Sequence, residues 1–293
     1  MDLPALPTRE GRMVSRGVGA PRVVLARALV YLALLAVVAV SLFPIYFALT
    51  TSLKQTRDAF TTPPTWIFTP TLEHHRFIWV ETPFPRYLFN TLVITIGTVL
   101  LSIPLGCMAA YYLARYRSRP IQVLLFSLLA VRAFPRILLL VPFFLVARAT
   151  QLYDTHILII LIIVAFNQPF AIWLMRGFFL DVPRELPEAA MIDGCSSLQA
   201  FLRVVLPVVR PGVFTAALFT FLFAYNEFLY CLILTGSHAK PLSVAIAQYG
   251  AEKIEYWSWS AAGAVGILAP IVLFIAVMQR HLVKGLTFGT LKG

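Results

Sequence analysis

The residues from Ala28 to Thr50 form an uninterrupted apolar run. A helix crosses a lipid bilayer with about 20 consecutive apolar residues, so this run is long enough to span a membrane. It exceeds the roughly 7–15 apolar residues of a cleaved signal peptide, and no small-residue cleavage site follows it. We therefore predict a retained transmembrane helix in this region.

Five further apolar runs have a similar length, and the composition agrees with a membrane protein. Of the 293 residues, 59% are hydrophobic and 13% are charged, whereas about 25% of the residues in a soluble domain are charged. The sequence therefore predicts an all-α polytopic membrane protein with six transmembrane helices. The predicted spans are residues 28–50, 86–114, 120–147, 156–175, 213–235 and 258–278.

The distribution of lysine and arginine predicts the orientation of these spans. A net charge of +11 would also suit a nucleic-acid-binding protein, but basic residues accumulate on the cytoplasmic side of membrane proteins. With the N-terminus inside, the inner segments hold 15 of the 24 basic residues and the outer segments hold 7. We expect both termini in the cytoplasm, a basic cytoplasmic tail over residues 1–27, a transmembrane domain over residues 28–293, and no nucleic-acid partner.

The two longest outer connections differ in composition. Residues 51–86 contain five prolines and several aromatic residues, which predicts an ordered, non-helical loop. Residues 235–257 form a second outer loop that is long enough to reach a partner.

A polar, helix-forming block lies between the fourth and fifth spans, on the predicted cytoplasmic side, over residues 181–211. Pro183 suits the start of a helix, and Gly194 suits its end because glycine accepts the backbone conformation that follows a helix. Ser196 and Gln199 have the spacing of a capping box, which predicts a second helix. The block is therefore expected to form two short helices with a turn at Gly194.

The second of these helices is predicted to be amphipathic. Leu198, Phe201, Leu202 and Val205 recur at helical spacing and predict one apolar stripe. Pro207 and Pro211–Gly212 are expected to end this helix before the fifth span. Such a helix could lie on the lipid surface or present a docking site to a soluble protein, and the local pattern leaves both interpretations open.

The same block carries a longer motif. Glu188-Ala189-Ala190, followed after three residues by Gly194 and after nine more by Val204-Val205-Leu206-Pro207, resembles the EAA signature of ABC importer permeases. The segments Ile172–Phe179, Asn226-Glu227-Phe228 and Lys284–Gly293 are similar to the carbohydrate-uptake branch, in particular to the smaller, six-span permease of maltose-type importers. The resemblance runs from about residue 28 to the end of the chain and implies the ABC type I importer permease fold.

This resemblance implies roles for several segments. The block would dock on a separate ATPase, with Glu188 meeting basic groups and Gly194 supplying the turn. The residues so assigned to coupling are Glu188, Ala189, Ala190, Asp193, Gly194, Leu206 and Pro207. The loop 235–257 would enter the sugar cleft of an extracytoplasmic binding protein. The tail Lys284–Gly293 would reach the nucleotide-binding subunits, although Thr290-Leu291 departs from the small residues that are common there.

The resemblance also implies the composition of the complex. A second homologous permease would form a heterodimer with this chain, together with two ATP-binding subunits and the binding protein, at the bacterial cytoplasmic membrane. No phosphate-binding G-x-x-x-x-G-K-[ST] motif occurs in the sequence. We therefore expect a non-catalytic translocation subunit that works by alternating access and holds no cofactor, with ATP and Mg²⁺ bound by the partner ATPase.

Two arginines lie inside the third span. Arg132 and Arg136 are one helical turn apart on the same face, and Arg132 is about 18 Å from the start of the span at 1.5 Å per residue. A charge at that depth is costly unless it faces a partner or a polar cavity. Glu227 lies at a similar depth in the fifth span and could neutralise one arginine. The other would then face an anionic substrate, such as a uronate oligosaccharide; ion pairing with Glu227 as a purely structural role is the alternative.

Other polar residues within the spans are candidates for the substrate pathway. Amides and aromatic hydroxyl groups suit the hydroxyls and C–H faces of sugars. These residues are Asn167, Gln168, Tyr225, Asn226 and Tyr230, in addition to Arg132, Arg136 and Glu227. Each amide or tyrosine could instead form hydrogen bonds between helices, and Asn90 is assigned that role.

Two other functions are open to a chain of this kind. A secondary transporter of an anionic solute could use Arg132, Arg136 and Glu227 as an ion relay, although no inverted repeat is present. A membrane enzyme would need clustered carboxylates or histidines, whereas the five histidines are scattered and predict no metal site. The three cysteines predict no disulfide framework.

Overall fold

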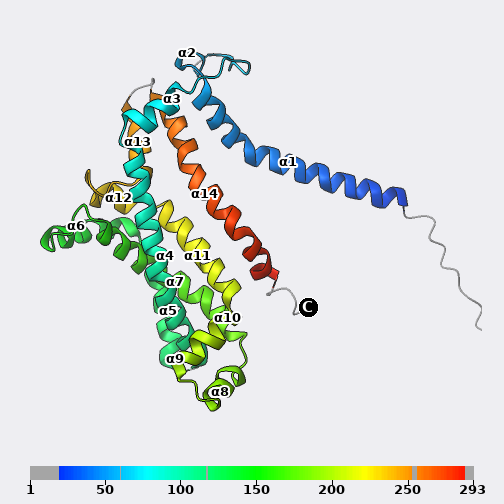
Figure 1. The fold of residues 1–293 in the computed structure, drawn as a ribbon, viewed down its shortest axis with the longest axis vertical. Helices are drawn as coiled ribbons and strands as arrows, with labels where there is room; N and C mark the ends of the chain where they lie inside the picture. The colour runs from blue at the N-terminus through cyan, green and yellow to red at the C-terminus, as the bar shows by residue number, and fades with distance from the viewer. Residues whose placement is uncertain (1–19, 60, 117, 253–255, 288–293) are drawn as a thin grey trace, which may run out of the picture. The chain divides into compact units, whose positions relative to one another are not determined.

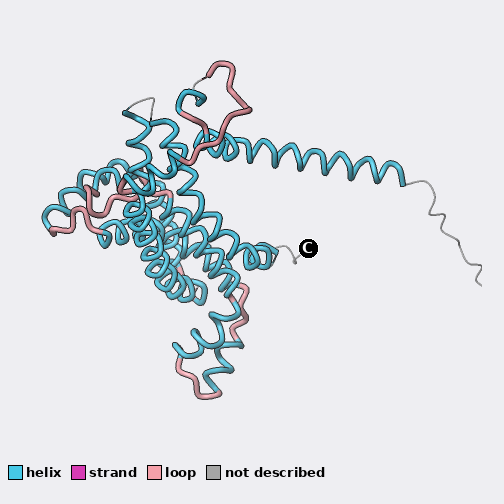
Figure 2. Tube along the Cα trace, turned by 45° about the horizontal axis from the view of Figure 1, so that its top comes forward, coloured by secondary structure: helices cyan, strands magenta, loops and turns pink. Residues whose placement is uncertain are grey.

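The computed structural model describes residues 20–59, 61–116, 118–252 and 256–287. All regular secondary structure in these ranges is helical (Figure 1; Figure 2). The chain divides into two compact units, Met1–Ala48 and Leu49–Gly293. Four helices of the described ranges are long and apolar enough to cross a membrane without a break, whereas the other two predicted spans are interrupted.

The first unit contains most of helix α1 (Ala20–Leu53). The predicted span 28–50 lies within this helix, but the helix starts earlier. Residues 20–27, which were predicted as part of a tail, are therefore helical. The rest of that tail, residues 1–19, lies outside the described ranges.

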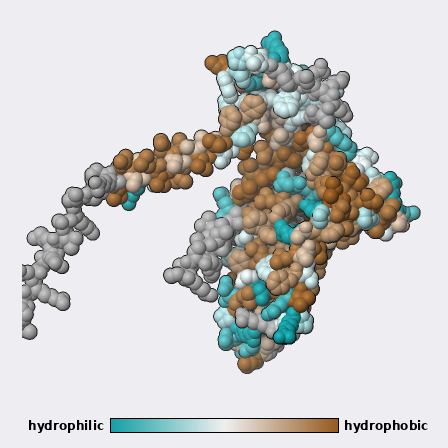
Figure 3. Space-filling view, turned by 180° about the vertical axis from the view of Figure 1, so that it is seen from behind, coloured by the Kyte–Doolittle hydropathy of each residue, from teal (hydrophilic) through white to brown (hydrophobic). Residues whose placement is uncertain are grey.

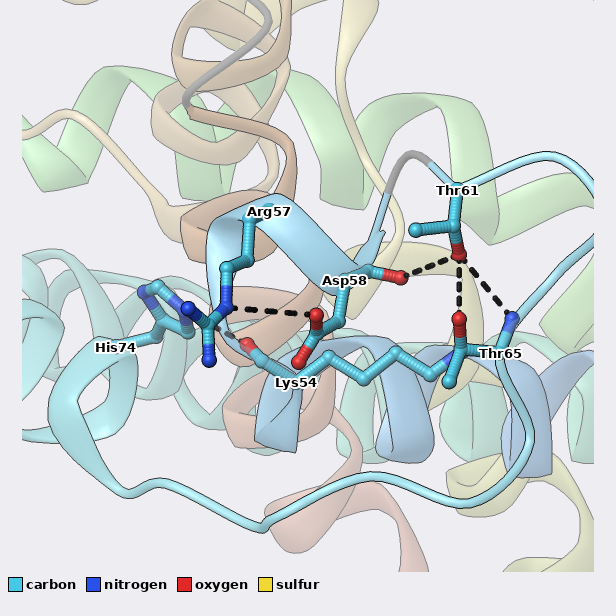
Figure 4. Close-up of polar contacts among 6 residues, drawn as sticks. All are labelled: Lys54, Arg57, Asp58, Thr61, Thr65 and His74. Carbon is cyan, nitrogen blue, oxygen red and sulfur yellow. Dashed lines mark hydrogen bonds and ion pairs between the residues drawn. The ribbon is translucent and has the colours of Figure 1, made fainter.

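The outer connection 51–86 is only partly non-helical, so the prediction of a non-helical loop was wrong over residues 51–53, 56–59, 73–81 and 84–86. It contains the short helices α2 (Thr56–Ala59) and α3 (Glu73–Arg76) and the π-helix η1 (Phe77–Glu81). Figure 4 shows the contacts that order it: Thr61 bonds to Thr65 and to the carbonyl of Asp58, and His74 Nε2 lies 2.9 Å from the carbonyl oxygen of Lys54. The His74 contact joins the short helix α3 to the start of the connection at Lys54.

The second unit is built around four long helices. These are α4 (Phe84–Arg115), α7 (His156–Leu180), α11 (Arg210–Tyr225) and α14 (Tyr256–Thr287). Helix α4 packs along α7 and α11, and α11 packs on α14. Within a membrane such helices are held by van der Waals packing and hydrogen bonds rather than by removal of apolar surface from water. The buried clusters around Ile159 and around Phe179 supply this packing.

The three unbroken spans of this unit extend beyond their predicted limits. Helix α4 extends beyond both ends of the predicted span 86–114. Helix α7 starts at the predicted residue and extends beyond the end of 156–175. Helix α14 continues past the predicted span 258–278 to Thr287, so the start of the predicted C-terminal tail is helical. Residues 288–293 of that tail lie outside the described ranges.

The third span, predicted as one helix over residues 120–147, is instead two segments. Helix α5 (Arg119–Ala133) ends before Pro135, and the 3₁₀-helix η2 (Arg136–Leu139) leads into α6 (Leu140–Ala149). The two segments meet at 87°. Phe134 and Pro135 are extended, because proline lacks the amide hydrogen that a helix needs and disfavours a helical conformation in the preceding residue.

The fifth span, predicted over residues 213–235, is also broken. It starts earlier, at Arg210, so Pro211 and Gly212 open this helix instead of ending the preceding one. It stops at Tyr225, and a short helix α12 (Leu229–Leu234) follows the break. The Asn226 side chain donates to the Leu222 carbonyl, a local bond that competes with helix continuation. The segments after the two breaks, α6 and α12, contact each other at one side of the bundle (Figure 1).

The connection predicted as the outer loop 235–257 contains a helix. Helix α13 (Leu242–Glu252) packs against α14 and α4, at the end of the bundle opposite α8 and α9 (Figure 1). The part of this connection that is free of helix is therefore short, Thr235–Pro241, and residues 253–255 lie outside the described ranges.

Candidate functional site

The polar block 181–211 folds into two short helical segments at one end of the bundle. Helix α8 (Glu185–Ile192) lies between Pro183 and Gly194, the residues predicted to start and end it. Gly194 has φ +92°. Its amide donates to the Met191 carbonyl, and the Cys195 amide donates to the Ala190 carbonyl. This pair of bonds is the Schellman arrangement that ends a helix at a glycine, so the predicted turn at Gly194 is confirmed.

The second segment comprises α9 (Ser197–Ala200), the π-helix η3 (Phe201–Val205) and α10 (Leu206–Val208). The predicted capping box is present: the Gln199 amide donates to Ser196 Oγ, and the Ser196 amide donates to Gln199 Oε1. The start of this helix is thus set by local sequence. It meets α11 at 81°.

The predicted apolar stripe on this segment is wrong in part. Phe201 and Val205 are buried against the bundle, but Leu198 and Leu202 are 59% and 49% exposed. The π-helical turn between Phe201 and Val205 changes the angle between successive side chains, so a spacing counted on an α-helix does not hold there. One face of the segment therefore joins the core, and another presents leucines to the surroundings.

The residues assigned to coupling lie on this block. Ala190 is buried on the inner side of α8, and Leu206 is half-buried. The other five are exposed: Glu188, Ala189, Asp193, Gly194 and Pro207. Ile192, next to the turn, is 87% exposed. Figure 3 shows hydrophobic residues across the middle of one face of the molecule and hydrophilic residues gathered toward both ends. The block thus presents polar and apolar side chains together beyond the apolar band.

A second site is a cavity of about 170 Å³ at the two broken spans. It lies where the end of α5, the middle of α7 and the break after α11 meet. The lining residues are Arg132, Arg136, Ile163, Phe166, Asn167, Phe223 and Glu227. The prediction that the two arginines share one helical face is wrong, because the chain breaks between them. Both arginines nevertheless line this cavity.

Arg136 is neutralised within the chain. Its guanidinium forms an ion pair with Glu227, which is only 6% exposed. The other carboxylate oxygen of Glu227 accepts a hydrogen bond from the Tyr230 amide at 3.1 Å, and the Tyr230 hydroxyl donates to the Arg136 carbonyl. The ion pair and its hydrogen bonds thus join the break in the third span to the break in the fifth.

Arg132 has a different environment. Its guanidinium lies 4.8 Å from the ring centre of Phe170 and 5.4 Å from that of Phe223. No carboxylate of the described residues lies within ion-pair distance of it. Aromatic faces attract a cation without neutralising it, so Arg132 keeps a positive charge at the cavity.

The other predicted pathway residues are divided between the cavity and the helix contacts. Asn167 lines the cavity, and its amide group donates to Ser102 on α4 and Thr220 on α11. The Tyr225 hydroxyl donates to the Ile267 carbonyl on α14, and the Gln168 amide group donates to the Ser102 carbonyl. Those three residues therefore form hydrogen bonds between helices, which was their alternative role. The Asn226 side chain bonds to the Leu222 carbonyl of the helix that precedes it, and Tyr230 supports Arg136.

The sequence did not indicate the aromatic residues of this cavity. Phe166 on α7 and Phe223 on α11 line the cavity, and Phe170, one turn after Phe166, lies beside Arg132. Their spacing in the sequence matches that of any buried helical face. Only the position of Arg132 and Arg136 distinguishes them from ordinary core phenylalanines.

A third set of contacts fixes the start of the outer connection 235–257. Asp154 accepts hydrogen bonds from the His238 and Ala239 amides, each at 2.9 Å. Asn90 donates to the carbonyls of His238 and Lys240, and its Oδ1 lies 2.8 Å from Nε2 of His156 on α7. The interhelical bond predicted for Asn90 is therefore confirmed, and the same side chain also holds this connection. Although burial raises the pKa of Asp154, bonds from the backbone amides of Ala239, His238 and Gly236 lower it below its ordinary value overall.

Comparison with known proteins assigns a family to this architecture. Residues 102–288, more than half of the chain, match the family described as the binding-protein-dependent transport system inner membrane component. The chain belongs to this family. The permease contains the whole matched region within its second unit.

The permease is similar to transport proteins along most of its length. A probable ABC transporter permease of Sinorhizobium fredii, y4oR, is 40% identical over 86% of this chain and 91% of the relative. The trehalose transport permease SugB of Mycobacterium tuberculosis is 37% identical over 88% and 94%. A solved bacterial ABC transporter for the acidic polysaccharide alginate has a chain that aligns with a TM-score of 0.72 at 22% identity, over 88% of this chain and 96% of that one.

These relationships decide between the functions that the sequence left open. The permease is a non-catalytic, multi-pass component of a sugar-importing ABC transporter in the inner membrane, and a separate ATPase hydrolyses ATP. A secondary transporter and a membrane enzyme are thereby excluded. The resemblance to carbohydrate-uptake permeases is confirmed.

Proposed function

We propose that this permease imports acidic saccharides, such as uronate oligosaccharides, and that Arg132 contacts their carboxylates. The observation that carries the proposal is the difference between the two arginines of one cavity. Glu227 neutralises Arg136, whereas Arg132 has only the rings of Phe170 and Phe223 beside it. A guanidinium binds a carboxylate through two parallel hydrogen bonds, which makes Arg132 suited to a uronate.

The residues around Arg132 suit the ring and the hydroxyl groups of a sugar, in addition to its carboxylate. Phe170 and Phe223 offer aromatic faces against which the C–H face of a pyranose ring can stack. Asn167, on the same cavity, offers an amide to sugar hydroxyls. The alginate importer shares the fold of this permease, which does not identify the substrate. The trehalose permease is named for a neutral sugar, so the relatives do not decide between acidic and neutral substrates. The proposal therefore depends on Arg132.

We also propose that a second permease covers the Arg132 side of the chain and forms a heterodimer with it. Arg132 and the neighbouring Phe134, Ile137 and Leu138 are exposed on the isolated chain. An arginine that faced lipid at mid-membrane depth would be strongly unfavourable, so this surface requires a partner. With a second permease opposite, the cavity becomes one wall of a pathway between two subunits.

Energy coupling is proposed to occur through the block 181–211. The EAA residues Glu188, Ala189 and Ala190, with Asp193, Gly194, Leu206 and Pro207, are assigned to docking on the ATPase. Support comes from the exposed Ile192 and Leu198 beside the rigid turn at Gly194, which give a soluble partner an apolar contact. We also propose that this block and both termini lie in the cytoplasm, and that the connection 235–257 faces the extracytoplasmic binding protein. Alternating access would then move the segments on either side of the two breaks.

The substitution Arg132→Gln tests the substrate. We expect the purified transporter, reconstituted with its ATPase and binding protein, to lose its preference for acidic over neutral saccharides of equal length by about tenfold to a hundredfold, because one charge-assisted bidentate contact is lost. The measurement is saccharide-stimulated ATP hydrolysis with a binding protein that delivers both saccharides.

A matched control is Arg148→Gln. Arg148 also lies over aromatic faces, those of Phe144 and Tyr153, but it does not line the cavity, so its loss should leave the preference unchanged. Arg136→Gln should lower the stability of the complex by removing the partner of Glu227. An unchanged ratio of acidic to neutral transport in the Arg132→Gln variant contradicts the proposal.

A further inference from the structure

A groove in the described part of the chain lies away from the cavity of Arg132 and Arg136. It has a volume of about 640 Å³ and separates the last turns of α4 from the α8–α9 block. Three tyrosines and two arginines contribute to it: Tyr111, Tyr112, Tyr116, Arg115 and Arg184. Its lining also includes Glu188 and Leu198, which the proposed coupling function places at the ATPase.

Arg115 offers hydrogen-bond donors that have no acceptor. Its Nε and Nη2 atoms are buried and lack a partner among the described residues. The guanidinium lies 5.1 Å from the ring centre of Tyr111, which holds it in place. Arg184 donates to the Arg115 carbonyl at 3.1 Å, so a second guanidinium reaches the same wall. Buried donors without acceptors are unfavourable, and a ligand with several acceptor oxygens would satisfy them.

The charge balance of the groove favours an anion. Glu188 is the single carboxylate among its lining residues. In the described ranges no ion pair joins Glu188 to Arg115 or Arg184. Two arginines against one glutamate leave the groove with an excess positive charge. A phosphodiester, whose oxygens accept bidentate bonds from arginine, matches this arrangement.

The surface next to the groove indicates a lipid as the source of that phosphodiester. Leu101, Leu105, Met108 and Tyr112 follow one another along α4 at helical spacing and are 37%, 49%, 55% and 57% exposed. This apolar stripe leads directly to the groove, which Met108 and Tyr112 also line. Tyrosines are common where a membrane helix meets the headgroup layer. An acyl chain on the stripe would place its headgroup between the arginines.

We propose that this groove binds one anionic phospholipid, with its phosphate on Arg115 and Arg184 and an acyl chain along α4. The headgroup would lie directly behind Glu188 and Ser197, which also line the groove. The site would thereby make the α8–α9 block responsive to the anionic lipid of the leaflet in which it lies. In the proposed orientation this is the cytoplasmic leaflet, where basic groups between helices meet anionic headgroups.

The test uses the assembled transporter, purified in a neutral detergent and titrated with phosphatidylglycerol, phosphatidylcholine or inorganic phosphate. Native mass spectrometry counts the bound lipids. We expect one tightly bound phosphatidylglycerol, about tenfold weaker binding in Arg115→Gln because charge-assisted bonds are lost, and no displacement by inorganic phosphate. Arg119→Gln, which removes an exposed arginine outside the groove, is the matched control and should bind like the unaltered protein.

Two results would overturn the proposal. One is equal phosphatidylglycerol binding by Arg115→Gln and the unaltered transporter. The other is the absence of a tightly bound lipid in the full complex, which would mean that the ATPase or the second permease fills the groove. If Arg115→Gln does not assemble, Arg115→Lys keeps the charge but lacks the planar fork. That variant should also bind more weakly, and unchanged affinity would again count against the site.

Discussion

At the scale of single residues, Arg132 and Arg136 are four positions apart but lie in different surroundings. Arg132 lies beside the rings of Phe170 and Phe223, and Arg136 is paired with a carboxylate 91 residues away. The cause is the break at Phe134–Pro135, which turns the two side chains independently. A helix without that break would have presented both to the same partner.

Gly194 offers a prediction at this scale. Its φ of +92° is unfavourable for other residues, but a Cβ there would meet nothing within 4 Å. Gly194→Val should therefore act through backbone conformation alone, at a cost of roughly 1–2 kcal/mol to the turn. We expect substrate-stimulated ATP hydrolysis to fall sharply, while the amount of permease in the membrane stays the same.

The control for this change is Gly194→Asn, because asparagine tolerates a positive φ better than other residues do. It should retain most of the stimulation. Normal coupled transport by the Gly194→Val variant would contradict the role given to this turn.

At the scale of elements, the helices that carry the block are positioned by one close crossing. Gly212, at the start of α11, lies against the ring of Phe178 near the end of α7. The block 181–211 connects these two helices, so the crossing sets how its ends approach each other. Breaks at Pro135 and at Asn226–Phe228 then separate the long, packed segments from the short α6 and α12.

Two glycine substitutions test this crossing. Gly212→Ala would place a methyl group on the Phe178 ring, and we expect a loss of about 1–3 kcal/mol through overpacking. Gly177→Ala, on α7, meets nothing within 4 Å and should be neutral or slightly stabilising, since alanine favours a helix by about 0.5–1 kcal/mol over glycine. Thermal unfolding of the solubilised complex measures both. Equal shifts in the two variants would argue against a tight crossing at Gly212.

At the scale of the whole molecule, the two ends of the bundle differ in what they present. One end carries the α8–α10 block and its basic groove, and the other carries α3, α13 and the network of Asn90 and Asp154 (Figure 1). The count of basic residues predicts that the first end is cytoplasmic. The cavity lined by Arg132 and Arg136 lies between them, at the breaks.

The three native cysteines test this orientation. Cys195 is partly exposed beside the turn at Gly194, whereas Cys107 and Cys231 are buried, at 3% and 1% exposed. A membrane-impermeant maleimide should label Cys195 in inside-out vesicles stripped of peripheral subunits and leave right-side-out vesicles unlabelled. A Cys195→Ser variant should abolish the labelling. Labelling of Cys195 from the outside would reverse the predicted topology.

The sequence alone determined the membrane class, the order of the spans and the two-helix block. Run length, a glycine after a helix and a Ser196–Gln199 capping box are local properties, so they can be read without the fold. The EAA spacing identified the family for the same reason.

Tertiary structure decided which polar residues share the cavity, where the third and fifth spans break, and which face of η3 is buried. It also bonded Asn90 on α4 both to the outer connection and to α7, and it placed Arg115 in a groove. These outcomes depend on contacts between residues 65 to 150 positions apart. Local spacing permits several such contacts equally, and the packing of the helices selects among them.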